Sequence, residues 1–548
     1  MIQALELENV KGFASRQRID FAPITLLFGA NSAGKSTIVQ ALLYLHEILE
    51  RGTADVGRTE LGGHVVELGG FERLVHRHDL KRAMTLRVDF AIPGSLDRLR
   101  RDISDFPFPD LDDEFESAWL ELTIRHRAVG TLWGPVVERA VIGVAGVSEA
   151  LVCLDTGPRL AEADPVYVWV NLGHPLIAEQ SSEVVDAWGE IALPDEAYPK
   201  VDVSSGTPEP PPVRGSVTGL ADGRWAPMFA VPRTRRSVLP QIDEPLVLVL
   251  PGAGGQAANA LSVAVLDASG DADRLGSSET VHARERAVVH VQAFLEMVVL
   301  GTTAQLASSL RESLYIGPLR GVPTEGSLFA RAGRRTSWAD GLAAWEALLS
   351  DWQLLDPTNA WLKRLDTGCE VFWQQLFDPN SEERDAEQEH VDAAVRRLLL
   401  GNGGPAFVLP SEVGAGISQV MPVIVAAVQK RAGITLIEQP EIHVHPALQV
   451  GLGDLFIETA NRDGARRVLL VETHSEHLLL RLLRRIRQTT EGELTGDAPP
   501  FSGEKLSIVY VENGPEGVRT RRLRVDERGE FKDRWPKGFF AERMEELL

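Results

Sequence analysis

Cysteine, aromatic residues and long apolar runs are all scarce in this chain of 548 residues. The two cysteines, Cys153 and Cys369, are too few for a disulfide framework and have no cysteine or histidine neighbours at zinc-ligand spacing, so we expect two buried thiols. No apolar run approaches the roughly 20 residues that a membrane-spanning helix needs, and the chain starts with strand-like sequence instead of an export signal. These absences predict a cytoplasmic location and no membrane partner.

A positive net charge is also missing. Lysine and arginine total 56 against 78 aspartates and glutamates, and the resulting formal charge of −22 argues against a protein that coats nucleic acid through its overall field. Local basic clusters remain, and solvation or internal ion pairing is their simplest interpretation. One cluster lies on the helix predicted at 478–487, where a DNA-backbone contact through Arg484 and Arg485 is the alternative.

What the sequence does contain is a complete phosphate-binding loop at residues 29–36. It follows an apolar run at 24–28, which indicates a buried strand, and it opens a run from Ser36 to Leu49 with apolar residues at helical spacing. Glycines at both ends allow backbone N–H groups and the helix N-terminus to point at phosphate oxygens. The sequence therefore predicts nucleotide binding by the following residues: Gly29, Asn31, Ser32, Ala33, Gly34, Lys35, Ser36 and Thr37.

Two apolar strands with polar ends predict a second half of the same site. Residues 434–438 end in Glu438, a hard oxygen ligand at a strand tip of the kind that Mg²⁺ requires. Residues 467–471 are followed by a polar segment at 472–475, and a glycine-rich turn at 414–416 opens a further helix. The phosphate loop already binds the terminal phosphate of one nucleotide. A second helix N-terminus that can bind phosphate is therefore explained if it contacts the nucleotide of another subunit.

Apolar periodicity and composition divide the rest of the chain into segments that flank or interrupt this site. We expect an N-terminal half of the nucleotide domain at 1–85 that includes a hairpin at 2–8 and 17–21, and a C-terminal half at 401–548 that includes a closing hairpin at 506–511 and 518–525. Between them, 86–310 is a β-rich and partly helical insertion with a proline-rich stretch at 208–212. Residues 311–400 are mainly helical, with helices at 338–354 and 359–377 and an acidic tract at 378–392; a terminal helix is expected at 539–548.

The order and spacing of these motifs resemble the ABC-type ATPase heads of the OLD, RecF and SMC-like branch. Besides the phosphate loop, the resemblance rests on 414–419, on Glu438-Gln-Pro-Glu441 with His443-Val-His-Pro446, and on Glu472-Thr-His-Ser475. Tyr315-Ile-Gly-Pro-Leu-Arg320 and Trp535-Pro-Lys-Gly-Phe-Phe540 further resemble small prokaryotic AAA-type ATPases of that branch, many of which sit in anti-phage defence operons. The resemblance covers about 1–85 and 311–548, and it implies an α/β P-loop fold: an ABC-type head with a large β-rich and helical insertion.

The resemblance also implies roles for individual residues. ATP and Mg²⁺ would be the cofactors, with Lys35 at the β- and γ-phosphates and with Ser36 and Glu438 supporting the metal. Residues Gly414, Gly416, Ser418 and Gln419 would form a signature loop that reaches the nucleotide of the other subunit in a head-to-tail homodimer. His474 would be the switch histidine at the γ-phosphate, and 443–446 would face the partner head.

Two departures from the pattern concern catalysis. The residue after the Mg²⁺ carboxylate is usually a glutamate that orients the attacking water, but here it is Gln439, whose amide cannot accept a proton. Glu441 would replace it if the turn at Pro440 brings it round; otherwise hydrolysis is slow. In addition, no glutamine occurs between Gln40 and Gln180, so the usual glutamine loop cannot be placed.

Three functions remain open from the sequence. The first is an ATPase in a homodimer or higher homo-oligomer that controls a separate effector, a nuclease or toxin, in anti-phage defence. The second is a DNA repair or recombination ATPase that binds DNA directly, and the third is an ATP-gated scaffold with negligible hydrolysis. OLD proteins carry a nuclease domain after the head, but only about 70 residues follow His474 and they lack an acidic cluster of nuclease type, so we do not expect this chain to be a nuclease.

Overall fold

The computed structural model describes most of both halves of the predicted nucleotide domain and part of the insertion. The described residues are 2–59, 66–92, 117–129, 132–144, 146, 148–156, 166–171, 174–175, 225–231, 237–240, 246, 294–323, 336–376, 395–401, 406–431, 433–462 and 467–536. The predictions for 208–212, 378–392 and 539–548 lie outside these ranges.

A large antiparallel sheet contains the N-terminus. Eight of the described strands pair in the order β11-β10-β9-β8-β7-β6-β1-β2. Their bounds are β1 (Ile2–Glu8), β2 (Gln17–Asp20), β6 (Met84–Ala91), β7 (Ser117–Val129), β8 (Leu132–Val144), β9 (Val152–Asp155), β10 (Val166–Asn171) and β11 (Trp225–Val231). The predicted hairpin of β1 and β2 is confirmed. The expected boundary between residues 85 and 86 falls inside β6, so the β-rich insertion continues the sheet that the N-terminal hairpin starts.

A second sheet is mainly parallel and carries the phosphate loop. Its order is β12-β16-β17-β3-β18-β19, with only β19 antiparallel to its neighbour. The strands are β3 (Ile24–Phe28), β12 (Leu314–Ile316), β16 (Gly433–Glu438), β17 (Arg467–Glu472), β18 (Leu506–Gly514) and β19 (Gly517–Leu523). The predicted strands at 24–28, 434–438 and 467–471 and the closing hairpin are thus confirmed. Because β3, β17 and β16 are adjacent and parallel, their carboxyl ends meet at one edge of the sheet.

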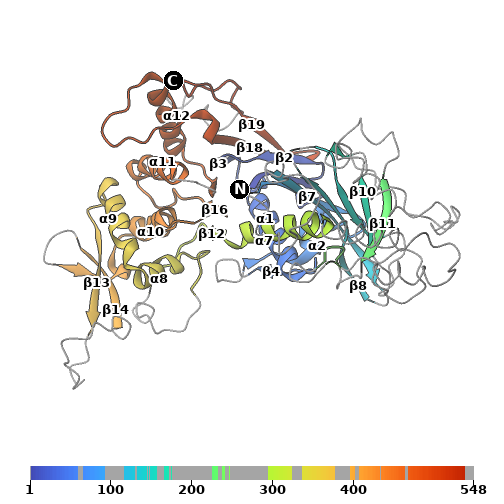
Figure 1. The fold of residues 1–548 in the computed structure, drawn as a ribbon. Coiled ribbons are helices and arrows are strands. Elements are labelled where there is room, and N and C mark those ends of the chain that lie inside the picture. The colour runs from blue at the N-terminus through green and yellow to red at the C-terminus, as the bar shows by residue number, and fades with distance from the viewer. Residues whose placement is uncertain are drawn as a thin grey trace, which may run out of the picture.

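Helices lie between the two sheets and on the outer face of the parallel one (Figure 1). Side chains alternate along each strand, so Leu436 packs with α1 (Lys35–Arg51) and the antiparallel sheet, whereas Ile437 packs with the outer helices. α7 (Thr302–Arg311) packs beside α1 in the inner layer. The outer helices are α8 (Leu342–Ser350), α9 (Leu355–Arg364), α10 (Ala415–Val428), α11 (Pro446–Asn461) and α12 (Glu476–Glu491). Within the described residues, every helix is too short or too polar to span a bilayer.

Short elements complete the described fold. They are β4 (Arg58–Thr59), β5 (Val66–Glu67), α2 (Gly70–Leu74), η1 (His76–His78), η5 (Met297–Gly301), η7 (Trp352–Leu354), β13 (Glu370–Leu376), β14 (Val395–Gly401), β15 (Phe407–Val408), η8 (Pro410–Glu412) and η9 (Gly503–Lys505). One of the two expected buried thiols, Cys153, is buried, but Cys369 is only partly covered, so that expectation was wrong for Cys369.

Two helix predictions at 338–377 were wrong in extent. α8 starts at Leu342 because Gly341 before it has a φ of 78°, a left-handed conformation that ends the preceding loop. The helix predicted at 359–377 stops with α9 at Arg364, and Asp366 and Gly368 have positive φ. Residues 370–376 instead form strand β13, which pairs with β14. The sequence pattern missed this strand because its pairing partner lies outside any local window.

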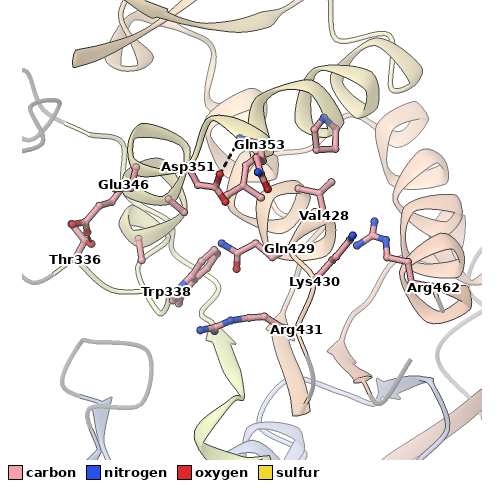
Figure 2. Close-up of a pocket in the computed structure, with 15 residues that line it drawn as sticks. Thr336, Trp338, Glu346, Asp351, Gln353, Val428, Gln429, Lys430, Arg431 and Arg462 are labelled. Atoms are coloured by element: carbon pink, nitrogen blue, oxygen red, sulfur yellow. Dashed lines mark hydrogen bonds between the residues drawn. The ribbon is translucent and has the colours of Figure 1, made fainter. Parts of the chain in front are cut away.

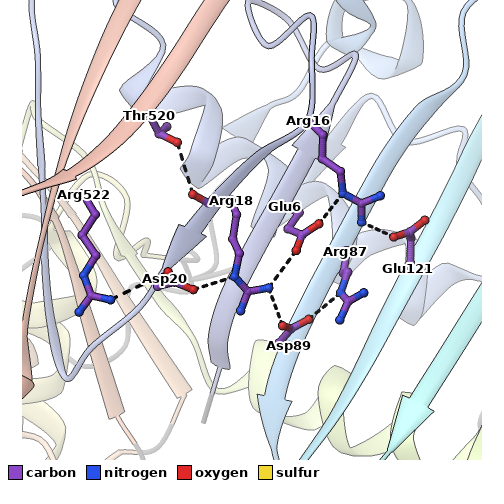
Figure 3. A network of polar contacts seen from close by, with 9 residues as sticks. All are labelled: Glu6, Arg16, Arg18, Asp20, Arg87, Asp89, Glu121, Thr520 and Arg522. Atoms are coloured by element: carbon purple, nitrogen blue, oxygen red, sulfur yellow. Dashed lines mark hydrogen bonds and ion pairs between the residues drawn. The ribbon is translucent and has the colours of Figure 1, made fainter. Parts of the chain in front are cut away.

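A polar network joins the edges of the two sheets (Figure 3). On the antiparallel sheet, Arg18 contacts Glu6, Asp20 and Asp89 at 2.7–2.8 Å. The edge strand β2 then meets the edge strand β19, where Arg522 lies 3.9 Å from Asp20 and the Thr520 amide donates to the Gln17 side chain at 3.0 Å. These contacts hold the β-rich part against the nucleotide domain.

Two arginines bind the C-terminal carbonyls of α10. Arg467, at the start of β17 and only 3% exposed, donates to the carbonyls of Ala426 and Gln429 at 2.6 and 3.0 Å and to the Thr435 hydroxyl at 2.8 Å. Arg462 donates to the carbonyl of Ala427. Burial is the main cause that lowers the pKa of Arg467, to about 9, and the charges of neighbouring arginines add to it. These contacts satisfy helix-end carbonyls that have no partner within the helix.

We expect Arg467→Met to destabilise the protein without a direct effect on nucleotide chemistry. The substitution leaves two buried carbonyls without a donor, and the loss of such a buried network typically costs about 3 kcal/mol. Denaturant unfolding measures the change. An unfolding midpoint equal to that of the wild type would show that solvent satisfies these carbonyls.

Candidate nucleotide site

The phosphate loop has the backbone that its glycines predict. Gly29 has a φ of 147° and Gly34 a φ of 106°, and Ser32 between them is also left-handed at 61°. A Cβ on Gly29 would lie 2.1 Å from the carbonyl oxygen of Val511 in β18, so only glycine fits there. The loop therefore runs from β3 into α1 in a conformation that sequence-distant strand β18 helps to fix.

Lys35 and Ser36 at the start of α1 both contact one carboxylate, that of Glu472 at the end of β17. The Ser36 hydroxyl donates to Glu472 Oε2 at 2.9 Å, and Lys35 Nζ lies 3.6 Å from Glu472 Oε1. Lys35 also donates to the carbonyls of Gly29 and Ala30, each at 3.0 Å. Burial lowers the pKa of Lys35, although the charges of three glutamates oppose that shift. An ammonium held this way is aimed at the loop where phosphates would lie.

Glu438 lies one strand further from the phosphate loop than Glu472. The two residues are register partners at the ends of β16 and β17. Burial first, and then the charge of Glu472, raise the pKa of Glu438 to about 7, against a hydrogen bond from the Tyr315 side chain and the charges of Arg320 and Lys35. Burial is likewise the main cause of the raised pKa of Tyr315. The site thus holds two adjacent carboxylates whose mutual repulsion a bound cation would relieve.

Arg320 connects the end of β16 to the start of α10. It is 4% exposed, and its guanidinium donates to the carbonyl of Glu438 at 2.6 Å and to that of Gln419 at 3.3 Å. In return, the Gln419 side chain donates to the Arg320 carbonyl at 2.6 Å and accepts from its amide at 3.3 Å. Burial lowers the pKa of Arg320 to about 10, while Glu441 and Glu438 oppose the shift. The segment after β12 therefore fixes the two elements that border the site.

The turn at Pro440 places Glu441 next to the residues that follow β17. Its carboxylate accepts hydrogen bonds from the Thr473 hydroxyl and the His474 amide, both at 2.7 Å. Gln439 has a φ of 45°, which is strained for a residue with a side chain. Its backbone N–H donates to the backbone carbonyl of Glu472 at 2.7 Å. Burial raises the pKa of Glu441, and burial followed by the charge of Lys35 lowers that of His474.

The predicted signature loop is divided between surface and interior. Gly414 is exposed, whereas Ser418 is 1% exposed and donates its hydroxyl to the Ala415 carbonyl at 2.9 Å. Gln419 is also buried, in its contacts with Arg320. A Cβ on Gly416 would lie 3.0 Å from the carbonyl of His443, whose side chain is exposed. The exposed glycine turn and the 443–446 segment therefore form one surface, while Ser418 and Gln419 point away from it.

Two arginines of α12 are engaged within the protein and two are exposed. Arg485 is 8% exposed and makes two hydrogen bonds of 2.7 Å to the Asp454 carboxylate on α11, and Arg481 lies 3.8 Å from the same group. Arg484 and Arg487 are exposed. The hypothesis that Arg485 contacts DNA was wrong, because its charge is used to join two helices.

Sequence reasoning did not assign functions to Glu472, Tyr315 and Arg320. Glu472 has a sequence signal, since it follows a buried strand just as Glu438 does. Tyr315 and Arg320 lie about 120 residues before β16 and carry no local signal beyond the motif in which they occur. Their position against Glu438 follows from the pairing of β12 with β16.

A hollow of about 920 Å³ lies at the end of α10 opposite the nucleotide site (Figure 2). Charged side chains on its wall include Glu346, Asp351, Lys430, Arg431 and Arg462. No phosphate-loop residue lines it, so it is separate from the nucleotide site.

Two segments of the chain match known protein families. Residues 352–481 match the family described as "AAA domain, putative AbiEii toxin, Type IV TA system", and residues 4–46 match one described as "AAA domain". No curated protein matches the chain.

Among solved structures, the chain is similar to SMC head domains. It shares 10% identity with an SMC head bound to the C-winged helix domain of ScpA, over 96% of this chain and 98% of that one, with a TM-score of 0.38. It shares 7% identity with the SMC head domain from Thermotoga maritima (96% and 99% covered, TM-score 0.33). An SMC head with an extended coiled coil, bound to the C-terminal domain of ScpA derived from Pyrococcus furiosus, gives 11% (100% and 98% covered, TM-score 0.33).

The two family matches contain the phosphate loop at one end of the chain and both carboxylate-bearing strands at the other, and the fold brings these together at one sheet edge. The chain therefore carries an ATP-binding, AAA/ABC-type ATPase head whose N- and C-terminal halves are separated by an insertion.

Proposed function

We propose that this protein hydrolyses ATP with Mg²⁺ in a head-to-tail homodimer and uses the closed and open states to control a separate effector. The observation that carries this proposal is the convergence of Lys35, Ser36 and strand-end carboxylates on one buried edge of the parallel sheet. The donor set fits the group: a hydroxyl and carboxylates are hard oxygen ligands, and Mg²⁺ typically takes one or two carboxylates together with nucleotide phosphates. Bound Mg²⁺ would neutralise charge on the transferred phosphoryl group.

Glu441 is our candidate for the group that activates water. Its carboxylate accepts hydrogen bonds from the Thr473 hydroxyl and from the His474 amide. To accept a proton from water, the carboxylate would give up its hydrogen bond from the Thr473 hydroxyl. The backbone amide of His474 donates to this carboxylate, and in our proposal the His474 side chain responds to the γ-phosphate. Gln439, whose amide can orient water but accept no proton, has the supporting role.

Phosphate release by the purified protein tests this assignment. We expect Mg²⁺-dependent turnover that Lys35→Ala abolishes, and that Glu441→Gln lowers by about 100-fold or more with ATP binding retained. Assays with and without double-stranded DNA distinguish the second function, since stimulation by DNA would favour a DNA repair or recombination ATPase. ATP binding without turnover in the wild type would instead favour the scaffold.

The surface formed by Gly414, Gly416 and 443–446 supports a composite site between two subunits. Gly414, His443, His445 and Pro446 are exposed there, and Gly414 is the N-cap of α10. The phosphate loop of the same subunit already precedes a different helix, α1. In a head-to-tail dimer this surface of each subunit would cover the nucleotide of the other.

A mixing experiment checks that arrangement. Gly414 has open space around its Cβ position, so Gly414→Asp places a carboxylate on this surface without an internal clash, where it would repel the partner's nucleotide. We expect this variant and Lys35→Ala each to lack turnover. Mixing them in equal amounts should restore about a quarter of the wild-type rate, because half of the dimers then contain one intact composite site. Gly414→Ala serves as the uncharged control, and absence of any rescue would contradict a shared site.

The effector role is proposed from two likenesses to defence proteins. The matched family's description names a toxin and a toxin–antitoxin system, and the order of motifs resembles ATPases found in defence operons. Copurification of a neighbouring gene product with the ATP-trapped Glu441→Gln dimer tests it. An ATP-trapped dimer that captures no neighbouring gene product would count against effector control.

A further inference from the structure

We propose that Glu472, at the end of β17, is the protein carboxylate that binds Mg²⁺ directly together with Ser36, and that Glu438 lies behind it. This inference rests on the proposed function and names a ligand of the same site. Among the three site carboxylates, Glu472 alone contacts both phosphate-loop side chains, at 2.9 Å to Ser36 and 3.6 Å to Lys35.

The separation of the two oxygens is the first argument. With Mg²⁺–oxygen distances of about 2.0–2.1 Å, neighbouring ligands of an octahedral ion are about 2.9 Å apart. Ser36 Oγ and Glu472 Oε2 are separated by 2.9 Å. The two oxygens are therefore as far apart as neighbouring ligands of one magnesium ion, which would replace the proton that Ser36 now donates to Glu472.

Strand order is the second argument. β17 lies between β3, which leads into the phosphate loop, and β16, which carries Glu438. Glu438 is hydrogen-bonded by Tyr315, which extends from β12 on the far side of β16. Its backbone is fixed on that side too, by the 2.6 Å bond from Arg320 to its carbonyl. Glu438 thus has its hydrogen-bond partners on the side away from the phosphate loop, and Glu472 stands between it and Ser36.

Burial is the third argument. Glu472 is 7% exposed and Lys35 3%, so the negative charge of Glu472 is compensated inside the protein by Lys35 and by the Ser36 hydroxyl. ATP would draw Lys35 toward its phosphates and remove part of that compensation. A dication beside Glu472 would restore it, which couples nucleotide binding to metal binding at this residue.

Calorimetric titration of ATP, once in EDTA and once in Mg²⁺, tests the assignment by a readout other than turnover. For the wild type we expect Mg²⁺ to strengthen ATP binding. In Glu472→Gln we expect that enhancement to fall by at least about tenfold. Metal-free ATP should bind this variant as tightly as the wild type or more tightly, because a negative charge near the phosphates is gone. A merely structural role would weaken both titrations together.

Two further variants show whether the effect depends on the charge of residue 472, on the length of its side chain, or on which of the two strands carries the carboxylate. Glu472→Asp keeps the charge but retracts the oxygens by one methylene, so it should lose metal enhancement without the gain in metal-free binding. Glu438→Gln should change the enhancement by less than about threefold, since it leaves the Ser36–Glu472 pair intact. The inference is overturned if Glu438→Gln removes the enhancement and Glu472→Gln keeps it. If the wild type binds no ATP in either buffer, both the proposed function and this inference fail.

Discussion

Gly29→Ala is expected to abolish measurable ATP binding. The added Cβ would lie 2.1 Å from the Val511 carbonyl oxygen of β18, and the φ of 147° is one that residues with side chains rarely adopt. The loop would have to move away from β18, and the Gly29 carbonyl that holds Lys35 at 3.0 Å would move with it. Loss of the lysine and loop contacts amounts to about 3 kcal/mol or more, which is at least a 100-fold loss of affinity.

Calorimetric titration with ATP measures this effect. Gly496→Ala is the matched control, because Gly496 also has a positive φ, of 59°, but has nothing within 4 Å of its Cβ position. An alanine there carries only the strain of a left-handed residue, about 1 kcal/mol, without the clash, and should bind ATP normally. Wild-type affinity in a folded Gly29→Ala protein would show that the loop tolerates displacement, contrary to our account.

Arg320→Met is expected to lower both stability and turnover. The guanidinium donates to the carbonyl of Glu438 at the end of β16 and to that of Gln419 in α10, and its removal takes this donor from the Glu438 carbonyl. We expect a loss of about 3 kcal/mol in the free energy of unfolding. Turnover should also fall by about tenfold or more, because Glu438 and Glu441 lose a neighbouring cation and the strand end loses its anchor.

Arg467→Met provides the comparison for this variant. Arg467 is equally buried and also binds carbonyls of α10, but at the helix end and sheet edge opposite the nucleotide site. Denaturant unfolding should show similar destabilisation for both variants, whereas phosphate release by the folded fraction should fall only for Arg320→Met. Equal turnover in the two would mean that Arg320 is purely structural.

Much of the fold was predictable because it depends on local pattern. The apolar runs before Gly29, at 434–438 and at 467–471 are buried on both faces, and such runs read clearly as parallel strands. The strand at 370–376 was predicted as helix, because its β pairing with 395–401 is not encoded locally. Likewise, the spacing of the arginines predicted one polar face of α12. It did not indicate that Arg485 binds the carboxylate of Asp454 on another helix.

The sequence by itself determined that this protein has a phosphate loop and two carboxylate-tipped strands, because glycine spacing and strand periodicity are properties of short segments. Which carboxylate reaches the loop was decided only by the tertiary structure. Ser36 and Glu472 are separated by 436 residues and meet because β17, not β16, pairs with β3. The same holds for Tyr315 and Arg320, whose positions at Glu438 follow from strand order, a property of the assembled sheet and of no single stretch of chain.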